Sequence, residues 1–209
     1  MSGGSPLSYI WWLVSDAAGI VALLLVSASV ALGLAMAARA VRRPAPRRIA
    51  MRLHEQLALA ALVSIAVHGL ALLGDHWLKP GLTGIAVPFT LHYKPGFTGL
   101  GIIAGYLAAL LGPSFYLRRR IGARRWRRLH RATVLVWGLS VVHALGGGTD
   151  AGRLWLRLVV LAPLVPIAYL LVVRALDPGR GPPRTTKPDR LTAATARRGS
   201  AADTPAARS

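Results

Sequence analysis

Cysteine is absent from the 209-residue sequence. Disulfide bonds, thiolate-held iron–sulfur clusters, covalent c-type haem attachment and cysteine nucleophiles are therefore excluded for these residues. Acidic residues are also few, with 7 Asp and Glu against 26 Lys and Arg, which gives a formal net charge of +19. Such an imbalance can indicate nucleic-acid binding. Here the arginines gather at the ends of apolar runs, which is typical of membrane orientation, so we predict no nucleic-acid partner.

Long apolar runs dominate what is present, and apolar residues make up 54% of the chain. About 20 such residues in a helix cross the hydrocarbon core of a bilayer. The sequence therefore predicts an all-α bundle of about five transmembrane helices, at residues 17–38, 53–73, 98–117, 130–146 and 154–174. Glycine and proline predict distortions near the end of the third helix, at Gly112 and Pro113, and in the fifth, at Pro163 and Pro166. The first run lacks the positive flank of a cleaved signal peptide, so we expect it to be retained.

Basic residues are distributed unevenly between the connecting segments. Three segments are rich in arginine: residues 39–52, 118–131 and 177–209. Two others hold few basic residues: residues 74–97, with Lys79 and Lys94, and residues 147–153, with Arg153. Because cytoplasmic loops carry the excess of Lys and Arg, we predict a multi-pass protein in contact with membrane lipid, its N-terminus outside and its C-terminus cytoplasmic. The composition of residues 177–209 predicts a disordered, basic cytoplasmic tail.

Four of the six histidines lie in the second and fourth predicted helices. His54 and His68 are 14 residues apart, and His130 and His143 are 13 residues apart. Both helices are predicted to run outward, so each histidine of one should meet a histidine of the other at the same depth, with about 20 Å between the two levels. Six-coordinate b-type haem needs two imidazoles facing each other across its plane. The spacing thus predicts two stacked sites: an inner pair, His54 with His130, and an outer pair, His68 with His143.

The two spacings differ in helical phase. At 100° per residue, 14 residues return to within about 40° of the starting face, whereas 13 residues miss it by about 140°. The fourth helix should therefore be overwound, or the outer haem should lie at a different azimuth around the helix axis. Gly138 lies between the two histidines and is a candidate position for the distortion.

Other interpretations of these histidines stay open. They could be isolated polar residues bonded to the backbone, or they could line a path for protons or metal ions in a transporter, since ionisable groups inside a membrane are costly and usually functional. The remaining two histidines, His76 and His92, are predicted to be solvated residues of the long outer loop.

Charged residues beside the histidines are candidates to complete the sites. Four arginines flank the inner pair and could bind haem propionates: Arg52, Arg127, Arg128 and Arg131. Asp150, in Gly-Gly-Gly-Thr-Asp, could shape an outer acceptor site or belong to a solvated turn. Residues 118–131 could anchor the positive side or dock an acidic donor. We expect Trp126 to be an interfacial side chain, and we expect Glu55 to point away from the His54 imidazole.

The sequence around these histidines resembles the ferric reductase-like transmembrane family. That family includes the membrane cores of ferric reductases and NADPH oxidases and the haem subunit of bacterial methionine-sulfoxide reductase systems. The resemblance covers about residues 10–175, and the matching stretches are LHEQLALAALVSIAVH (53–68), VPF (87–89), RRWRRLHR (124–131) and VVHALGGGTD (141–150). The 14- and 13-residue histidine spacings are also similar to those of the family.

The resemblance implies that residues 1–176 form a haem-binding transmembrane domain that carries electrons across a bacterial-type plasma membrane. It implies one or two haem b groups whose iron is held by the inner and outer histidine pairs. The chain would then be the haem subunit of an oxidoreductase. Large family members continue into flavin- and nicotinamide-binding domains, but residues 177–209 contain no GxGxxG fingerprint. We therefore expect a separate flavin reductase or a quinol as electron donor, and an acceptor at the outer face.

Overall fold

The computed structural model describes residues 9–38, 40 and 43–176, which form helices joined by turns. No strand occurs among these residues, so the predicted all-α class is confirmed. The chain divides into two compact units, Met1–Ala175 and Leu176–Ser209. The predicted disordered tail, residues 177–209, lies outside the described residues.

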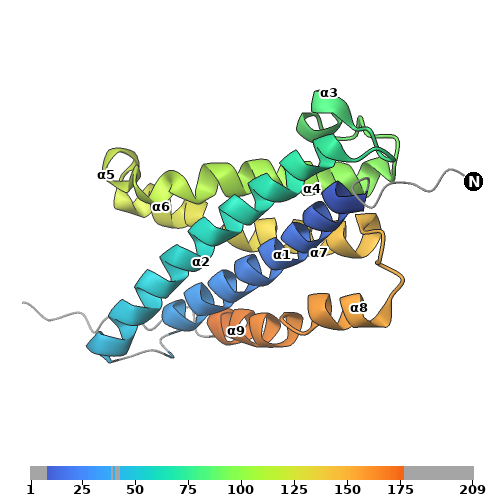
Figure 1. Cartoon of the computed structure of the whole chain (residues 1–209). Helices are drawn as coiled ribbons and strands as arrows, with labels where there is room; N and C mark the ends of the chain where they lie inside the picture. Colours follow the sequence, from blue (N-terminus) through green and yellow to red (C-terminus); the bar gives the residue numbers. More distant parts are fainter. Residues whose placement is uncertain (1–8, 39, 41–42, 177–209) are drawn as a thin grey trace, which may run out of the picture. The chain divides into compact units, whose positions relative to one another are not determined.

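The first two long helices, α1 and α2, pack side by side along their length (Figure 1). α1 spans Ile10–Ala37, and α2 spans Pro44–Ala71 and continues into a 3-10 turn, η2, at Leu72–Gly74. Both helices begin earlier than the sequence predicted. Pro44 lies in the first turn of α2, where a missing N–H costs nothing. Arg47, Arg48 and Arg52 therefore lie on the helix rather than in a loop.

A short helix, α3 (Gly81–Ala86), lies in the connection to α4 (Pro95–Leu111). α4 is followed by a 3-10 turn, η3, at Pro113–Phe115. Pro113 has no N–H with which to continue the α-helical hydrogen bonds, so the helix changes geometry there. The predicted distortion at Gly112 and Pro113 is confirmed.

The arginine-rich segment after η3 is mostly helical. It contains α5 (Arg118–Ile121) and α6 (Ala123–His130), separated by Gly122, whose φ of 90° favours glycine. The connecting segment at residues 118–131 is therefore built mostly from short helices, which its composition had not been used to predict. Arginine is a good helix former, and its charge does not prevent a short exposed helix. α7 follows at Thr133–Gly147.

The last predicted span consists of two helices, α8 (Leu154–Leu161) and α9 (Leu164–Leu176). Pro163 lies at the interruption, where its ring removes a hydrogen bond to the preceding turn. Pro166 lies in the first turn of α9, where proline is tolerated. The predicted distortion of this span is confirmed.

α1 has a central place in the packing. Besides α2 it contacts α7, while α4 packs closely against α7. A core cluster joins buried side chains of α1, α7, α8 and α9: Leu23, Val30, Leu34, Trp137, Val141, Leu156, Val160 and Ile167. In this cluster the Trp137 indole N–H donates to Ser27 Oγ at 3.0 Å. α2, which carries His54 and His68, and α7, which carries His143, are thus both held against α1.

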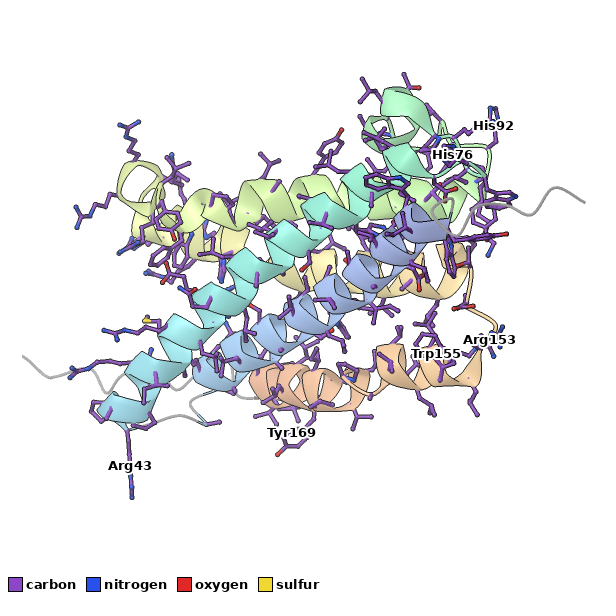
Figure 2. All side chains as sticks on the ribbon, viewed as in Figure 1. Arg43, His76, His92, Arg153, Trp155 and Tyr169 are labelled. Carbon is purple, nitrogen blue, oxygen red and sulfur yellow. The ribbon has the colours of Figure 1, made fainter. Side chains whose placement is uncertain are left out.

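Four helices in the described part of the chain are long and apolar enough to cross a membrane: Ile10–Ala37, Pro44–Gly74, Pro95–Phe115 and Leu154–Leu176. Their large apolar side chains are largely exposed, and Tyr169 projects away from α9 (Figure 2). Such surfaces suit lipid rather than water. The four helices are consistent with a multi-pass membrane protein in contact with lipid. The predicted fourth span is α7, which has only 15 residues and reaches crossing length only together with α6.

Candidate haem-ligand site

Histidines of α2 face histidines of α6 and α7 at two positions. The ring centroids of the inner pair, His54 and His130, are 5.9 Å apart with ring planes at 88°. Those of the outer pair, His68 and His143, are 6.2 Å apart with ring planes at 73°. A metal ion about 2 Å from one nitrogen of each ring would separate the centroids by about 6 Å. The structure therefore brings together both predicted pairs, at a spacing that admits one metal ion between the rings.

Each pair lies in the wall of an apolar cavity. The outer cavity has a volume of about 460 Å³ and is bordered by α1, α2, α4, α7 and α8. The inner cavity has a volume of about 260 Å³. Ligand pockets commonly measure about 300–1,000 Å³, so the inner cavity is somewhat small. Met36 and Met51 line it, and these flexible side chains can move to admit a larger group.

The second ring nitrogen of three histidines is bonded to a backbone carbonyl. Nδ1 lies 2.9 Å from the Ser29 carbonyl oxygen in His54 and 2.8 Å from the Ser15 carbonyl oxygen in His68. In His143, Nδ1 lies 2.8 Å from the Phe97 carbonyl oxygen. A carbonyl oxygen can only accept, so Nδ1 carries the hydrogen and Nε2 keeps its lone pair. Metal-binding histidines typically show this arrangement, because the bond orients the ring and raises its basicity.

A 3-10 turn between α6 and α7 accommodates the 13-residue spacing. Four backbone N–H groups in this turn donate to the carbonyl three residues earlier, at distances of 2.9–3.3 Å: Arg131, Ala132, Val134 and Leu135. A 3-10 helix turns about 120° per residue against about 100° in an α-helix, so these bonds overwind the chain at the junction of α6 and α7. The predicted overwinding is therefore present, but Gly138 was the wrong position for it, because Gly138 lies within the uninterrupted helix α7.

His130 differs from the other three histidines. Its Nδ1 is buried and has no hydrogen-bond partner among the described residues. The Trp126 ring stacks on the imidazole instead, with centroids 5.0 Å apart and planes at 22°. Phe115 packs edge-on against the same tryptophan at 5.8 Å. Trp126, expected as an interfacial side chain, thus belongs to the wall of the inner cavity.

The charged residues that were predicted to complete the sites do not line the two cavities. The four candidate propionate partners are exposed, and none is among the described residues that line the inner cavity: Arg52, Arg127, Arg128 and Arg131. Asp150 is paired with Arg153 at 3.5 Å in the turn before α8, and its neighbour Thr149 lines the outer cavity. Long arginine side chains can reach a bound group by changing rotamer, so their role as propionate partners stays a prediction.

Two acidic residues of the outer site were missed by the sequence reasoning. Asp16 and the buried Asp75 line the outer cavity, and Asp75 Oδ1 accepts from the backbone N–H groups of Trp77 and Leu78. Glu55, which was expected to point away from the His54 imidazole, lines the inner cavity and accepts a 2.8 Å hydrogen bond from the Tyr116 hydroxyl instead. Acidic residues are rare in this chain, and their presence in apolar runs was the available signal.

The two remaining histidines lie apart from both pairs. His76 and His92 are exposed and lie among the loops around α3 (Figure 2). The prediction that they are surface residues is confirmed.

The donor sets fit a macrocyclic metal group better than a bare ion. Among the described residues, no group of three or more His, Cys, Asp or Glu side chains is placed to hold a metal ion. A bare zinc or iron ion usually needs at least three protein ligands, whereas haem iron already has four ring nitrogens and needs only axial ligands. Two facing imidazoles with free Nε2 atoms and apolar surroundings meet that requirement.

Comparison with known proteins adds no identification. No protein-family model matches the chain, and no solved structure matches it significantly. The resemblance to the ferric reductase-like family therefore stays a prediction.

Proposed function

We propose that this protein carries electrons across a membrane through two b-type haems held by the inner and outer histidine pairs. The observation that supports this most strongly is the duplicated bis-histidine geometry, with centroid separations of 5.9 and 6.2 Å. The Nδ1–carbonyl bonds of three ligands add to it, because they leave Nε2 free for a metal.

His54 and His130 would hold the inner haem, and His68 and His143 the outer one. Haem iron supplies a reversible one-electron couple between its ferric and ferrous states. The protein's part would be to hold two facing imidazoles at each cavity and to surround them with apolar side chains. Along α2 the two levels are about 21 Å apart, since 14 residues rise about 1.5 Å each.

The proposal includes a five-span topology in which the segment from His130 to the end of α7 forms the fourth crossing. The N-terminus would lie outside and the arginine-rich segments in the cytoplasm, which places the inner pair beside the cationic surface. A reporter inserted near Gly84 should then behave as external, and one fused after residue 180 as cytoplasmic. A cytoplasmic signal at Gly84 would reverse the inner and outer assignments.

We further propose that the chain is a haem subunit of the ferric reductase-like type in a bacterial-type plasma membrane. Its donor would be a separate flavin reductase or a quinol, which would deliver electrons at the inner site. An acceptor at the outer face would receive them.

A reduced-minus-oxidised optical spectrum of the purified protein, with a haem count, tests the proposal. Two haem b per chain with low-spin spectra are expected. One haem would restrict the proposal to a single pair. A protein that binds no haem after expression with sufficient haem supply would overturn it and favour a histidine-lined transporter for protons or metal ions.

A further inference from the structure

Three of the four histidine ligands are bonded to a carbonyl in the same sequence context. The acceptor residue is followed four positions later by glycine: Ser15 by Gly19, Ser29 by Gly33, and Phe97 by Gly101. The first two lie on α1 and the third lies on α4, helices that carry none of the four histidines. The same arrangement, a carbonyl that accepts from a histidine and a glycine four residues later, therefore occurs three times on two helices.

Helix geometry explains why the glycine is needed. In an α-helix the carbonyl of residue i bonds to the N–H of residue i+4, and the Cβ of residue i+4 tilts back toward that carbonyl. A side chain there covers the second lone pair of the oxygen. Glycine leaves it open, so that an imidazole from a neighbouring helix can donate to it.

Each glycine is in close contact with the histidine it serves. A Cβ built at Gly101 would lie 2.5 Å from His143 Nδ1, and one at Gly19 would lie 2.9 Å from His68 Nδ1. A Cβ at Gly33 would lie 3.2 Å from His54 Cε1. At each of the three glycines, the imidazole ring thus occupies the space that a side chain would fill.

On α1 the arrangement is repeated with its serines. Ser15 Oγ donates to the His68 carbonyl oxygen at 3.0 Å, and Ser29 Oγ donates to the His54 carbonyl oxygen at 3.3 Å. Both serines are buried. The two Ser-x-x-x-Gly units are 14 residues apart, which equals the spacing of the two histidines on α2. α1 therefore binds both the ring and the backbone of each α2 histidine.

A fourth unit is missing from α4. A shift of 14 residues from Phe97 and Gly101 leads to Leu111 and Phe115. α4 ends at Leu111, and Phe115 packs on Trp126, which covers His130. His130 has no carbonyl acceptor among the described residues. At the inner site, one histidine is thus bonded to a helix carbonyl, and at the outer site both histidines are.

We propose that Gly19, Gly33 and Gly101 are positioning residues that open a helix carbonyl to each ligand histidine, and so set the basicity and the haem affinity of His68, His54 and His143 respectively. This inference rests on the proposed function. α1 and α4 would then control the electronic properties of the haems without contributing a ligand. The two sites differ in this respect, because His130 has no such carbonyl and glycine among the described residues.

Alanine substitutions test this proposal site by site in the full-length protein. Gly101→Ala and Gly19→Ala should weaken retention of the outer haem, and Gly33→Ala that of the inner haem, by about 10- to 100-fold, as loss of an outer-shell partner usually does. The effect should decrease in the order Gly101, Gly19, Gly33, which follows the distances above. The matched control is Gly138→Ala, a helical glycine of α7 with no atom within 4 Å of its Cβ position.

A redox titration followed optically separates positioning from a general loss of stability. Where haem is retained, the potential of the affected haem should rise, because a less basic imidazole stabilises the ferric state less. The other haem should keep its wild-type potential. If Gly101→Ala or Gly19→Ala does not fold, the potential of the inner haem in Gly33→Ala tests the proposal, because the added methyl group meets the histidine at the longest of the three distances.

Haem-loaded variants with wild-type potentials and haem retention would overturn the positioning role and leave the proposed function intact. Shifts that appear at the wrong site, or equally in Gly138→Ala, would also overturn it. A wild-type protein without haem would overturn the proposed function itself, and the positioning role with it.

Discussion

The inner and outer sites each contain a pair of histidines, but they differ in how the imidazoles are supported. At the outer site both Nδ1 atoms donate to helix carbonyls. At the inner site only His54 does so, while His130 is stacked by Trp126. A hydrogen-bonded imidazole is more basic and more rigidly held. The comparison shows that two identical histidine pairs can form different sites when their neighbours differ.

The surroundings of the two sites differ in charge as well. Asp16 and Asp75 line the outer cavity, and Asp150 lies in the adjoining turn. Exposed arginines of α5 and α6 surround the inner end. Positive charge favours the reduced, less positive iron, and negative charge favours the oxidised iron. Electrostatics and hydrogen bonding therefore both favour a higher reduction potential at the inner site than at the outer site.

Removing single ligands should have the largest effect on this comparison. His68→Ala or His143→Ala should abolish the outer haem and leave the inner one, so the haem content should fall to about half if each pair holds one haem. His54→Ala or His130→Ala should do the reverse. Haem quantification with low-temperature spectra checks this.

The exposed His76 and His92 provide the matched controls for these variants. Their replacement should leave the haem content unchanged. Four ligand variants with full haem content and unaltered spectra would contradict the ligand assignment.

Loss of the aromatic support should affect the inner site alone. Trp126→Ala removes the ring that stacks on His130 and opens the inner cavity, so the inner haem should dissociate about 10- to 100-fold faster. Trp126→Phe should retain most of the wild-type behaviour, because a ring can still stack. Haem transfer to an apo-acceptor protein measures the rates.

The control for the tryptophan variants is Trp155→Ala, which changes an exposed side chain of α8 (Figure 2). Equal haem loss in Trp155→Ala, or outer-haem loss in Trp126→Ala, would argue against a local role for Trp126.

The two haems should also differ in reduction potential. Because no carbonyl of the described residues accepts from His130 and arginines lie nearby, the inner haem should have the higher potential and should be reduced first. A difference of about 59 mV would correspond to a tenfold preference for one site. A redox titration of wild type and of the single-haem variants assigns each potential. A lower inner potential would show that other charges outweigh these two effects.

The smallest expected effect concerns electron entry at the cationic end. If the donor is an acidic flavoprotein, salt should slow the reduction, since screening weakens long-range steering. Replacing Arg124, Arg125, Arg127 and Arg128 with glutamine should slow it further at low salt, whereas quinol-driven reduction should change little. Stopped-flow reduction at several salt concentrations measures this. Salt-independent rates with the flavoprotein would remove the docking role of these arginines.

Much of the helical framework could be predicted from the sequence, but the boundaries could not. Apolar length identified α1, α2, α4 and the α8–α9 pair, and Pro113 and Pro163 marked their interruptions. The early start of α2 and the helical arginine segment were missed. Charged residues were assigned to loops on the basis of topology, although an exposed helix tolerates them equally well.

The candidate sites were predicted only in part. The histidine spacings predicted both pairs, since equal offsets on parallel spans imply equal depths. The overwound turn was expected near Gly138, but it lies at residues 131–135, directly after His130. Trp126 was assigned to the interface, because a tryptophan beside arginines is typical of that location.

The sequence by itself determined the all-α class, the apolar helices and the pairing of histidines by depth, because these depend on composition and on the fixed rise of a helix. Only the tertiary structure decided which carbonyl each imidazole meets. The Ser15–Gly19, Ser29–Gly33 and Phe97–Gly101 units have meaning only when α1 and α4 lie against the histidine-bearing helices. That contact depends on helix rotation and close approach, which are set by the packing of all the side chains together.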